Sequence, residues 1–339
     1  MQRHVWRTPK AGSLNSLTLQ QESLPQLDAH DVRVQVTAVG LNFADIFALT
    51  GLYSATPQGS FIPGLEYAGE VVSVGAAVEA FCVGDRVMGV TRFGGYATVI
   101  DSRQEYVHLI PASWSDAQGA AYLAQTLTAW YALKWLGDIQ AGQQVLIHSA
   151  AGGVGLQAMR LARAVGAQPV GSVGSEQKVA LLQSEGFADV LVRQRPFSAQ
   201  LQQQSRRFDL VLDAIGGEVQ KASFAALKPM GRLVVFGAAE FTPRGSRPDY
   251  ISAAWKFLRR PRYDVMSMIS ENKSVMAFNL IWLWEQQERM SRLLEEVERM
   301  ELPPPHVGHQ FSFGDLHQAL DCLRSGKSTG KVILRVTHP

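Results

Sequence analysis

The pattern of apolar and polar positions divides the chain into a β-rich first part and a second part in which strands and helices alternate. In the first part, Val32–Val36 alternates apolar and polar residues with the period of two that a half-buried strand shows. Short apolar runs at 70–75, 85–90 and 94–99 are punctuated by glycine and predict further strands. We therefore predict a β-rich first domain over residues 1–118.

The character of the chain changes near Ser115, where helical spacing begins. Buried strands then alternate with amphipathic helices. The strands are predicted at 145–148, 169–173, 208–213 and 231–236, and the helices at 154–165 and 175–184. This alternation predicts an α/β fold with a parallel sheet covered by helices on both faces, which we assign to residues 119–287. A charged helix and a final strand at 330–336 follow, and we expect the segment 288–339 to return to the first domain.

A glycine-rich turn follows the predicted strand Val145–His148 and opens the next helix. Gly152 would let a pyrophosphate approach the backbone, and Gly155 would let the helix pack closely on the strand. The N-terminus of that helix adds free N–H groups and a partial positive charge. Ala150 replaces the first glycine of the usual G-x-G-x-x-G pattern, and a plain tight connection is the alternative. The strand-turn-helix context favours dinucleotide binding by Ala151, Gly152, Gly153, Val154 and Gly155.

NAD-binding folds usually have an acidic residue about 20 residues after such a turn, where it hydrogen-bonds to the ribose diol. The strand at 169–173 ends without one. Gly174 and Ser175 stand there instead, Lys178 follows, and Arg195 lies beyond the next strand. A carboxylate would repel a 2′-phosphate, whereas a hydroxyl and two cations would bind it. The sequence therefore predicts NADPH rather than NADH; the alternative is that both cations are only solvated.

Composition narrows the classes of protein. The chain has 339 residues, of which 46% are hydrophobic and 18% charged, so it is not mainly disordered. A net charge of +2 does not support nucleic-acid binding. Its two cysteines cannot form a disulfide framework or a four-cysteine zinc site. The N-terminus lacks the apolar core of a secretory signal, and the longest apolar run, 275–284, is too short for a bilayer span. We expect a cytoplasmic protein.

Several motifs occur in order along the chain, namely Gly40–Asp45, Gly51–Tyr53, Pro63–Gly69, Val83–Val87, the 150–155 turn, Leu227–Arg232 and Thr329–Val332. Together they resemble the zinc-independent quinone oxidoreductase branch of the medium-chain dehydrogenase/reductase superfamily. The stretch 249–283 is most similar to vesicle amine transport protein homologues. The resemblance implies a GroES-like catalytic domain interrupted by a Rossmann domain with a doubly wound parallel sheet. It also implies a cofactor in the cleft between them, and a homodimer joined through edge strands, here 275–283.

Zinc-dependent relatives carry ligands at three positions where this chain has none of the usual type. Asn42 stands in place of a catalytic Cys and Leu65 in place of a catalytic His, while the third ligand would fall near Ala124. Zinc needs thiolate, imidazole or carboxylate donors, so we expect no metal. The implied reaction is hydride transfer from NADPH to a quinone or related conjugated carbonyl, because such acceptors take hydride without a Lewis acid.

The resemblance also assigns roles to individual residues. Asn42 would face the nicotinamide ribose or the substrate, or else cap a turn. Tyr53 could donate a hydrogen bond to a developing oxyanion, or be a tyrosine packed by its ring. Thr128 would lie against the nicotinamide, or bond its own helix backbone. Further cofactor contacts are expected from Phe236, Gly237 and Lys331.

Some features leave alternatives open. The family often has Tyr where this chain has Gln194, so nucleotide affinity is expected to depend more on Arg195. The run Trp255–Tyr263 mixes cations with aromatics; we favour a solvated helix end over contact with an anionic membrane. Two other functions remain possible, a nucleotide-binding interaction protein with little turnover and a reductase of 2-enoyl thioesters.

Overall fold

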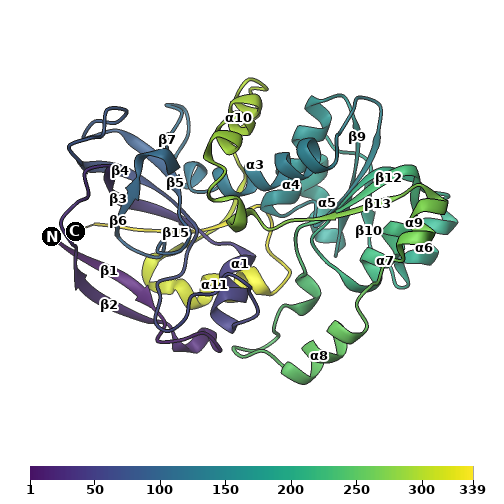
Figure 1. The fold of residues 1–339 in the computed structure, drawn as a ribbon, viewed down its shortest axis with the longest axis horizontal. Helices are drawn as coiled ribbons and strands as arrows, with labels where there is room; N and C mark the ends of the chain where they lie inside the picture. Colours follow the sequence, from purple (N-terminus) through teal and green to yellow (C-terminus); the bar gives the residue numbers. More distant parts are fainter. Residues whose placement is uncertain (339) are drawn as a thin grey trace. The chain divides into compact units, whose positions relative to one another are not determined.

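The computed structural model describes residues 1–338 and divides into two compact units, which are treated separately (Figure 1). Unit 1 comprises Met1–Ala124, Thr242–Pro248 and the chain from Pro304 onward. Unit 2 comprises Gln125–Phe241 and Asp249–Pro303.

A seven-stranded sheet forms the centre of unit 1, with the order β14-β15-β3-β4-β5-β7 and with β6 paired to β3. The long strand β3 buries Val32, Val34 and Val36 on one face, as its alternating sequence predicts. A β1-β2 ribbon and three helices complete the unit. The strands are β1 Gln2–Arg7, β2 Thr18–Ser23, β3 Asp31–Gly40, β4 Glu66–Val74, β5 Arg86–Val90, β6 Val99–Arg103, β7 Val107–Leu109, β14 Val307–Ser312 and β15 Lys331–Arg335, and the helices are α1 Phe43–Thr50, α2 Asp116–Gly119 and α11 Leu316–Arg324.

The strand expected at 94–99 begins only at Val99. Before it, the Trp6 N–H donates to the Tyr96 carbonyl (3.0 Å) and the Thr98 N–H to the His4 carbonyl (2.9 Å). The Tyr96 carbonyl and the Thr98 N–H are occupied by these isolated hydrogen bonds to β1, so they do not take part in a continuous pairing with a neighbouring strand. The glycine-rich segment is therefore an irregular connection.

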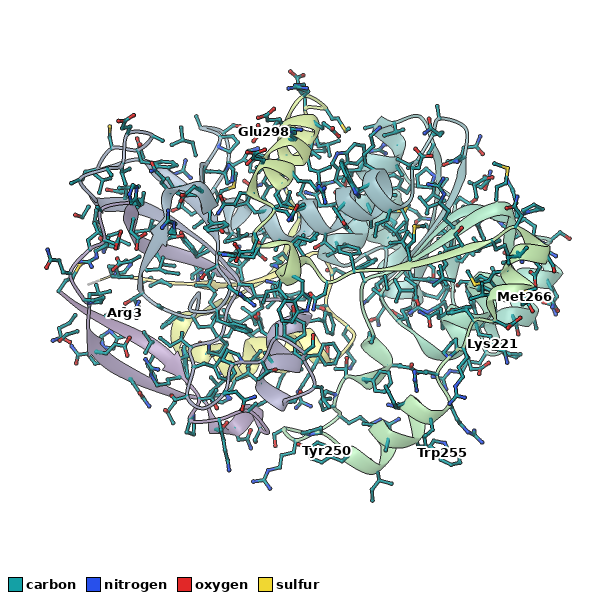
Figure 2. All side chains as sticks on the ribbon, viewed as in Figure 1. Arg3, Lys221, Tyr250, Trp255, Met266 and Glu298 are labelled. Carbon is teal, nitrogen blue, oxygen red and sulfur yellow. The ribbon has the colours of Figure 1, made fainter. Side chains whose placement is uncertain are left out.

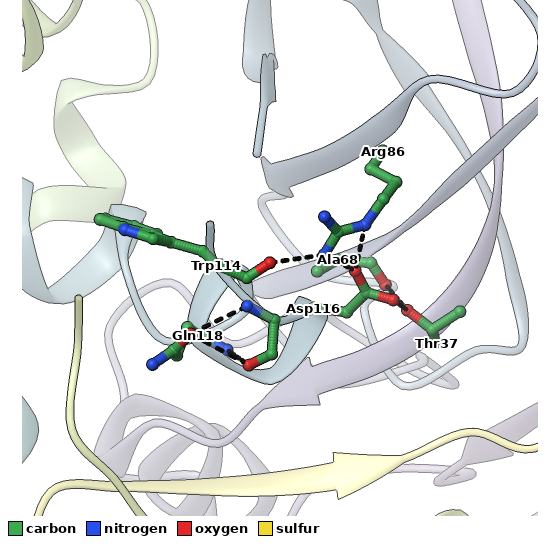
Figure 3. Close-up of polar contacts among 7 residues, drawn as sticks. Thr37, Ala68, Arg86, Trp114, Asp116 and Gln118 are labelled. Carbon is green, nitrogen blue, oxygen red and sulfur yellow. Dashed lines mark hydrogen bonds and ion pairs between the residues drawn. The ribbon is translucent and has the colours of Figure 1, made fainter. Parts of the chain in front are cut away.

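Polar contacts join the strands β3 and β5 of unit 1 to the start of α2 (Figure 3). The Arg86 guanidinium on β5 donates to the Asp116 carboxylate (2.6 and 3.0 Å) and to the Trp114 carbonyl (2.7 Å). The Thr37 hydroxyl on β3 donates to the other carboxylate oxygen of Asp116 (2.8 Å). The entry to α2 is thus held against the sheet by a charged side chain whose partners lie on separate strands.

A six-stranded, wholly parallel sheet forms the centre of unit 2, with the order β10-β9-β8-β11-β12-β13. From β8 the chain proceeds outward first through β9 and β10, then through β11, β12 and β13, so the order reverses between β8 and β11. In sheets of this kind ligands bind beyond the carboxyl ends of the strands at that reversal. The strands are β8 Gln144–His148, β9 Gln168–Val173, β10 Val190–Val192, β11 Phe208–Asp213, β12 Leu227–Val235 and β13 Ser274–Ala277.

Helices cover both faces of this sheet, which confirms the predicted doubly wound α/β class. Apolar residues of the strands pack with Phe197 and Leu201 of α6 and Ala222 of α7 on one face. On the other face, Gly171 of β9 contacts Met159 of α4 and Leu182 of α5. The helices are α3 Leu123–Trp130, α4 Gly153–Ala164, α5 Val179–Ser184, α6 Phe197–Gln203, α7 Gly217–Ala225, α8 Tyr250–Leu258, α9 Val265–Glu271 and α10 Gln287–Glu298.

Two details of unit 2 differ from the sequence analysis. The edge strand expected over 275–283 is β13 only as far as Ala277, and Leu280–Leu283 forms a 3₁₀ turn. Residues 288–303, expected in the returning segment, group with unit 2. Glu296 of α10 accepts a hydrogen bond from the Trp130 indole N–H (2.9 Å), which ties this helix to α3.

Candidate functional site

The turn between β8 and α4 has the close packing that its glycines predict. A Cβ on Gly155 would overlap the Ser149 carbonyl oxygen and stand 2.7 Å from the Ala150 Cα. A Cβ on Gly152, the N-cap of α4, would meet only the Ser149 carbonyl oxygen, at 3.2 Å, and otherwise open space. Gly155 is therefore required by packing within the turn, whereas Gly152 leaves room above the helix N-terminus, where a pyrophosphate binds in such folds.

The other candidate residues of unit 2 follow the same edge of the sheet. Gly174 and Ser175 come directly after β9, and Phe236 comes directly after β12, its N–H bonded to the Asp213 carbonyl (3.0 Å). Because the strands are parallel, these positions lie at the carboxyl edge together with the turn after β8. Gln125 of α3 contacts Gly153, so the helix that carries the half-buried Thr128 also passes this turn.

Arg193, which the sequence analysis did not select, lies at this edge immediately after β10. Its backbone N–H donates to the Val173 carbonyl at the end of β9 (2.9 Å). Its Nη1 donates to the Ser172 carbonyl (3.2 Å) and to the Ser172 hydroxyl (3.0 Å). Gln194 and Arg195 are exposed. Its position in the sequence could have identified it. Val192 of β10 pairs with Val173 of β9, so the residues that follow them, Arg193 and Gly174, are neighbours.

A buried hydrogen-bond chain supports the Ser172 side chain. His148 lies between the Ser172 hydroxyl (3.0 Å from Nδ1) and the Ser223 hydroxyl (2.7 Å from Nε2). The Ser223 hydroxyl donates its proton to the Val219 carbonyl (2.8 Å), so Nε2 must be the protonated nitrogen of His148. Nδ1 then accepts from Ser172, whose oxygen accepts from Arg193. Burial lowers the pKa of His148 to about 3, which keeps the ring neutral.

Cations gather beside Gly174. Lys178 is half-buried, and burial together with the positive charge of Arg193 lowers the pKa of its ammonium. Burial also lowers the pKa of Arg193, against the attraction of Asp213 on β11. The Asp213 carboxylate accepts the backbone N–H groups of Ile215 (2.8 Å) and Gly216 (3.2 Å). Two cations that raise each other's free energy are a favourable setting for an added anion.

In unit 1, Asn42 and Lys331 meet although 289 residues separate them in the chain. The Lys331 ammonium donates to the Asn42 amide oxygen (2.9 Å) and forms an ion pair with Glu66. The Asn42 amide nitrogen donates to Glu66 (3.0 Å) and to the Gly40 carbonyl (3.3 Å). The side chains of Lys331 and Glu66 are only 3% and 1% exposed. The amide of Asn42 therefore has a fixed orientation inside a buried network.

Asp45 and Tyr96 extend this network. One carboxylate oxygen of Asp45 accepts the Asn42 backbone N–H and the Tyr96 hydroxyl, both at 2.8 Å. Its other oxygen, Oδ1, has no hydrogen-bond partner within residues 1–338. Burial raises the pKa of Asp45 to about 7. Asp45 thus holds the backbone at the start of α1, and Tyr96 is a partner that could not be predicted from the sequence.

The residues at the zinc-ligand positions do not fit a zinc ion. Asn42 and Leu65 supply no thiolate or imidazole, and Glu66 already bears the Lys331 ammonium. A cation in contact with this carboxylate would have to displace a buried positive charge. Within residues 1–338, no group of three or more His, Cys, Asp and Glu side chains is placed to hold a metal.

Two further candidates are Tyr53 and the basic and aromatic run Trp255–Tyr263. The half-buried ring of Tyr53 packs against the apolar core of unit 1. In the basic and aromatic run, Arg259 stacks on Trp255 at 4.2 Å and Arg260 on Phe257 at 3.8 Å, measured to the ring centroids. Trp255 is exposed on α8, near the lower margin of Figure 2. No helix in the described part of the chain is long and apolar enough to cross a membrane.

Comparison with known proteins gives two matching family models and a set of relatives that match most of this chain. Residues 28–116 match the alcohol dehydrogenase GroES-like domain, and residues 186–334 match the zinc-binding dehydrogenase family. The human synaptic vesicle membrane protein VAT-1 homolog is 30% identical over 307 residues, which are 89% of this chain and 78% of that protein.

Solved structures agree with the fold over nearly the whole chain. Escherichia coli quinone oxidoreductase, determined in complex with NADPH, superposes with a TM-score of 0.84 at 25% identity and covers 99% of this chain and 100% of its own. The CurK enoyl reductase superposes with a TM-score of 0.82 at 26% identity and covers 99% of both chains. The similarity therefore extends across both units.

Proposed function

The chain belongs to the medium-chain dehydrogenase/reductase superfamily, and on that premise we propose that it is an NADPH-dependent reductase of quinones or related conjugated carbonyl compounds. The observation that carries the proposal is the β8–α4 turn, which is closed by packing at Gly155 and open at Gly152. The similarity to an NADPH-bound quinone oxidoreductase supports both the cofactor and the class of acceptor.

The residues of unit 2 fit the cofactor. The backbone of Ala151–Gly155 would receive the pyrophosphate at the N-terminus of α4. Gly174, Ser175 and Lys178, which follow β9, would lie along the adenosine half, and Phe236 and Gly237, which follow β12, along the nicotinamide half. The bound cofactor supplies a hydride, while the protein's part is binding and orientation.

The residues of unit 1 would serve the acceptor side. Lys331 and Glu66 hold the amide of Asn42 in one orientation, so Asn42 can position a ribose or a substrate group without reorganising. The Tyr53 hydroxyl would donate a hydrogen bond to the oxygen of the acceptor as negative charge develops. Quinones and enones spread that charge over a conjugated system, so they suit a site whose donor set does not fit zinc.

The proposal is tested by following NADPH absorbance with the purified full chain and a panel of quinones, enals and enones. We expect oxidation of NADPH in preference to NADH, and a fall of about 10- to 100-fold in kcat for Tyr53→Phe. The exposed Tyr250→Phe on α8 is the matched control and should retain wild-type turnover. Failure of every acceptor, with no binding of NADPH by fluorescence, would refute the proposed function.

A second candidate is reduction of 2-enoyl thioesters, which is favoured by the 26% identity to the CurK enoyl reductase. Adding enoyl thioesters to the same panel separates the two, since a thioester reductase would have the higher kcat/KM on them. A third outcome, tight NADPH binding with no acceptor reduced, would favour a nucleotide-binding interaction protein, in line with the similarity to the VAT-1 homolog.

We also propose that the protein is a homodimer. β13 is an edge strand of the unit 2 sheet, and the unpaired backbone groups of an edge strand are free to pair with another chain. Light scattering after size exclusion should give twice the chain mass. The substitution Val275→Pro, inside β13, should shift the protein toward the monomer.

A further inference from the structure

The inward face of helix α8 in unit 2 carries small and polar side chains. Ser252, Ala253 and Lys256 share one side of the helix and are half-buried. The Lys256 ammonium donates to the Glu240 carbonyl (2.6 Å), which ties this face to the 3₁₀ turn after β12. A surface helix usually turns its apolar stripe inward and its polar face toward solvent. In α8 the two faces are exchanged.

The outward face of α8 is apolar. Ile251, Trp255 and Leu258 stand at i, i+4 and i+7, which is the spacing of a ridge that packs against a second helix. Their exposed fractions are 86%, 58% and 64%. Tyr250 and Ala254 are exposed beside them, and Figure 2 labels Tyr250 and Trp255 on this helix. A contiguous apolar face of this kind marks a surface that a partner covers.

The two ends of α8 carry opposite charges. Asp249 is the N-cap, where one carboxylate oxygen accepts the Ser252 backbone N–H (3.0 Å). Arg259 and Arg260 follow the last turn and are exposed. None of these three charged side chains forms an ion pair within residues 1–338. A copy of the helix running in the opposite direction therefore offers the complementary charge at each end.

An antiparallel pair of α8 helices also matches the apolar ridge to itself. If a twofold axis passes between Ala254 and Trp255, the Ile251 of one copy lies opposite the Leu258 of the other. The same register sets the small Ala254 opposite the large Trp255. Facing helices interdigitate where large side chains meet small ones.

We propose that two copies of the chain associate through antiparallel α8 helices, with Asp249 of each copy paired to Arg260 of the other. At a rise of 1.5 Å per residue, both charges lie about 8 Å from the axis along the helix. The Arg260 guanidinium gives one N–H to the Phe257 carbonyl (2.6 Å) and has further donors for a carboxylate. The interface is isologous, because the same surface serves on both copies.

The inference goes beyond the proposed function and is separate from the edge strand β13, at which the homodimer is proposed. A chain that uses both surfaces forms assemblies larger than a dimer. One pair of nine-residue helices covers less than the roughly 1,200 Å² of a stable interface, so we expect a dissociation constant in the micromolar range.

An anionic lipid surface suits the same face less well. Asp249 and Asp264, the N-caps of α8 and α9, are exposed, and anionic headgroups would repel them. The Arg260 guanidinium lies over the Phe257 ring, so the ring would carry a charge with it into the acyl region. A second copy of α8 supplies apolar surface and both signs of charge together.

Sedimentation velocity on the full chain, over about 1–100 μM, tests the association by mass action. We expect the mean mass to double as the concentration rises. Ile251→Asp should weaken this association by at least about 100-fold, because it buries an unpaired carboxylate at the centre of the interface. A mass that rises equally in the wild type and in Ile251→Asp would overturn the inference, and so would a mass that does not change in either.

Two exposed tryptophans in unit 2 provide a matched pair of variants. Trp255 is 58% exposed with Arg259 stacked at 4.2 Å, and Trp135 is 52% exposed with Arg289 stacked at 4.5 Å. Trp255→Ser should weaken the association by at least about 10-fold, whereas Trp135→Ser should leave it unchanged. Equal effects of the two would contradict a specific role of α8.

A charge exchange tests the antiparallel register. Arg260→Asp places two carboxylates opposite each other and should weaken the association by at least about 10-fold. Adding Asp249→Arg should bring the dissociation constant back to within about threefold of wild type, because the pair is restored in reverse. Melting temperatures establish that each variant is folded. A double variant no tighter than Arg260→Asp alone would refute this register.

The remaining outcomes distinguish the occupants. Association abolished by Val275→Pro but unaffected by Ile251→Asp would assign it to β13 instead. Sedimentation of the wild type with phosphatidylserine vesicles, lost in Ile251→Asp while the mass in solution is the same for both, would make a lipid surface the occupant and overturn the inference. These measurements contain no cofactor or acceptor, so they stand or fall independently of the reductase proposal.

Discussion

Two buried polar networks, one in each unit, place a cation against a sheet in opposite ways. In unit 1 the Lys331 ammonium is matched by the Glu66 carboxylate, and Asn42 takes part of the remaining hydrogen bonding. In unit 2, Arg193 is held at one end by neutral groups, Ser172 and through it His148, and its other end lies beside Gly174. The first network is compensated by an ion pair, whereas in the second Arg193 is held by neutral groups and attracted by Asp213.

The difference shows how to tell a structural charge from a ligand-binding one. Gly40 contacts Lys331 and Glu66 so closely that a Cβ would stand 2.8 Å from a side-chain carbon of each, which leaves no room for a guest. At Gly174 a Cβ would stand 3.2 Å from the Arg193 Nη2, so the corresponding space borders one end of the guanidinium. Removal of a charge should therefore cost mainly folding free energy in unit 1 and mainly ligand affinity in unit 2.

The largest effect is expected from Lys331→Met. The substitution leaves the Glu66 carboxylate buried without its cation, and the free energy of unfolding in urea should fall by about 3–5 kcal/mol. Replacing both partners in Lys331→Met/Glu66→Gln should recover most of the loss, because no uncompensated charge remains. If the free energy of unfolding of Lys331→Met alone lay within about 1 kcal/mol of the wild-type value, the ion pair would not be needed to compensate the buried Glu66 carboxylate.

His148 should make the stability of unit 2 fall in acid. Its pKa is lowered from 6.5 to about 3 in the folded state, so the unfolded chain binds the proton more tightly. The free energy of unfolding should decrease as the pH falls below 6.5, by about 3 kcal/mol between pH 7 and pH 4 on this account. His148→Gln should lack that component of the slope, whereas the exposed His30→Gln should follow wild type.

Asp45 should give unit 1 a slope of the opposite sign. Its pKa is raised from 3.8 to about 7, so the folded chain binds the proton more tightly and stability falls as the pH rises from 4 to 7. The expected loss between pH 5 and pH 8 is about 2.5 kcal/mol. Asp45→Asn should remove this pH dependence, so the stability of the variant relative to wild type should be higher at pH 8 than at pH 5. Glu79→Gln, at an exposed position, is the control; a parallel pH profile for Asp45→Asn would contradict the assignment.

The smallest effect is expected from Ser172→Ala, which removes the side-chain acceptor of Arg193. We expect a loss of about 1 kcal/mol in stability and a rise of about 3- to 10-fold in the dissociation constant of 2′,5′-ADP. Ser184→Ala on α5, which removes an exposed hydroxyl, is the control for both measurements. An unchanged affinity for 2′,5′-ADP would mean that Ser172 does not orient the guanidinium.

Much of the fold could be predicted from local patterns. The helix predicted at 154–165 is α4, Gly153–Ala164, and the strand predicted at 145–148 lies within β8. Errors arose where long-range hydrogen bonds decide the local structure. Residues 94–98 alternate like a strand but bond singly to β1 and to a loop, and 280–283 is apolar like a strand but forms a 3₁₀ turn.

The candidate site shows the same division. The glycine turn and the missing acid after β9 could be recognised in the sequence, because each depends on the spacing of residues close together in the chain. Lys331 was assigned to cofactor binding from a motif, yet its contacts in the described structure are Glu66 and Asn42. Arg193 was not selected from the sequence, and its place beside Gly174 became evident only in the structure.

The sequence by itself determined the α/β alternation, the phosphate-binding turn and the loss of zinc donors, since these depend on residue type and on periods of a few residues. The tertiary structure decided which charges meet. Pairing of Ile333 with Gly40 brings Lys331 to Asn42, and pairing of Val192 with Val173 brings Arg193 to Gly174. Strand register sets these neighbours, and it is fixed by packing across the whole sheet rather than by residues adjacent in the chain.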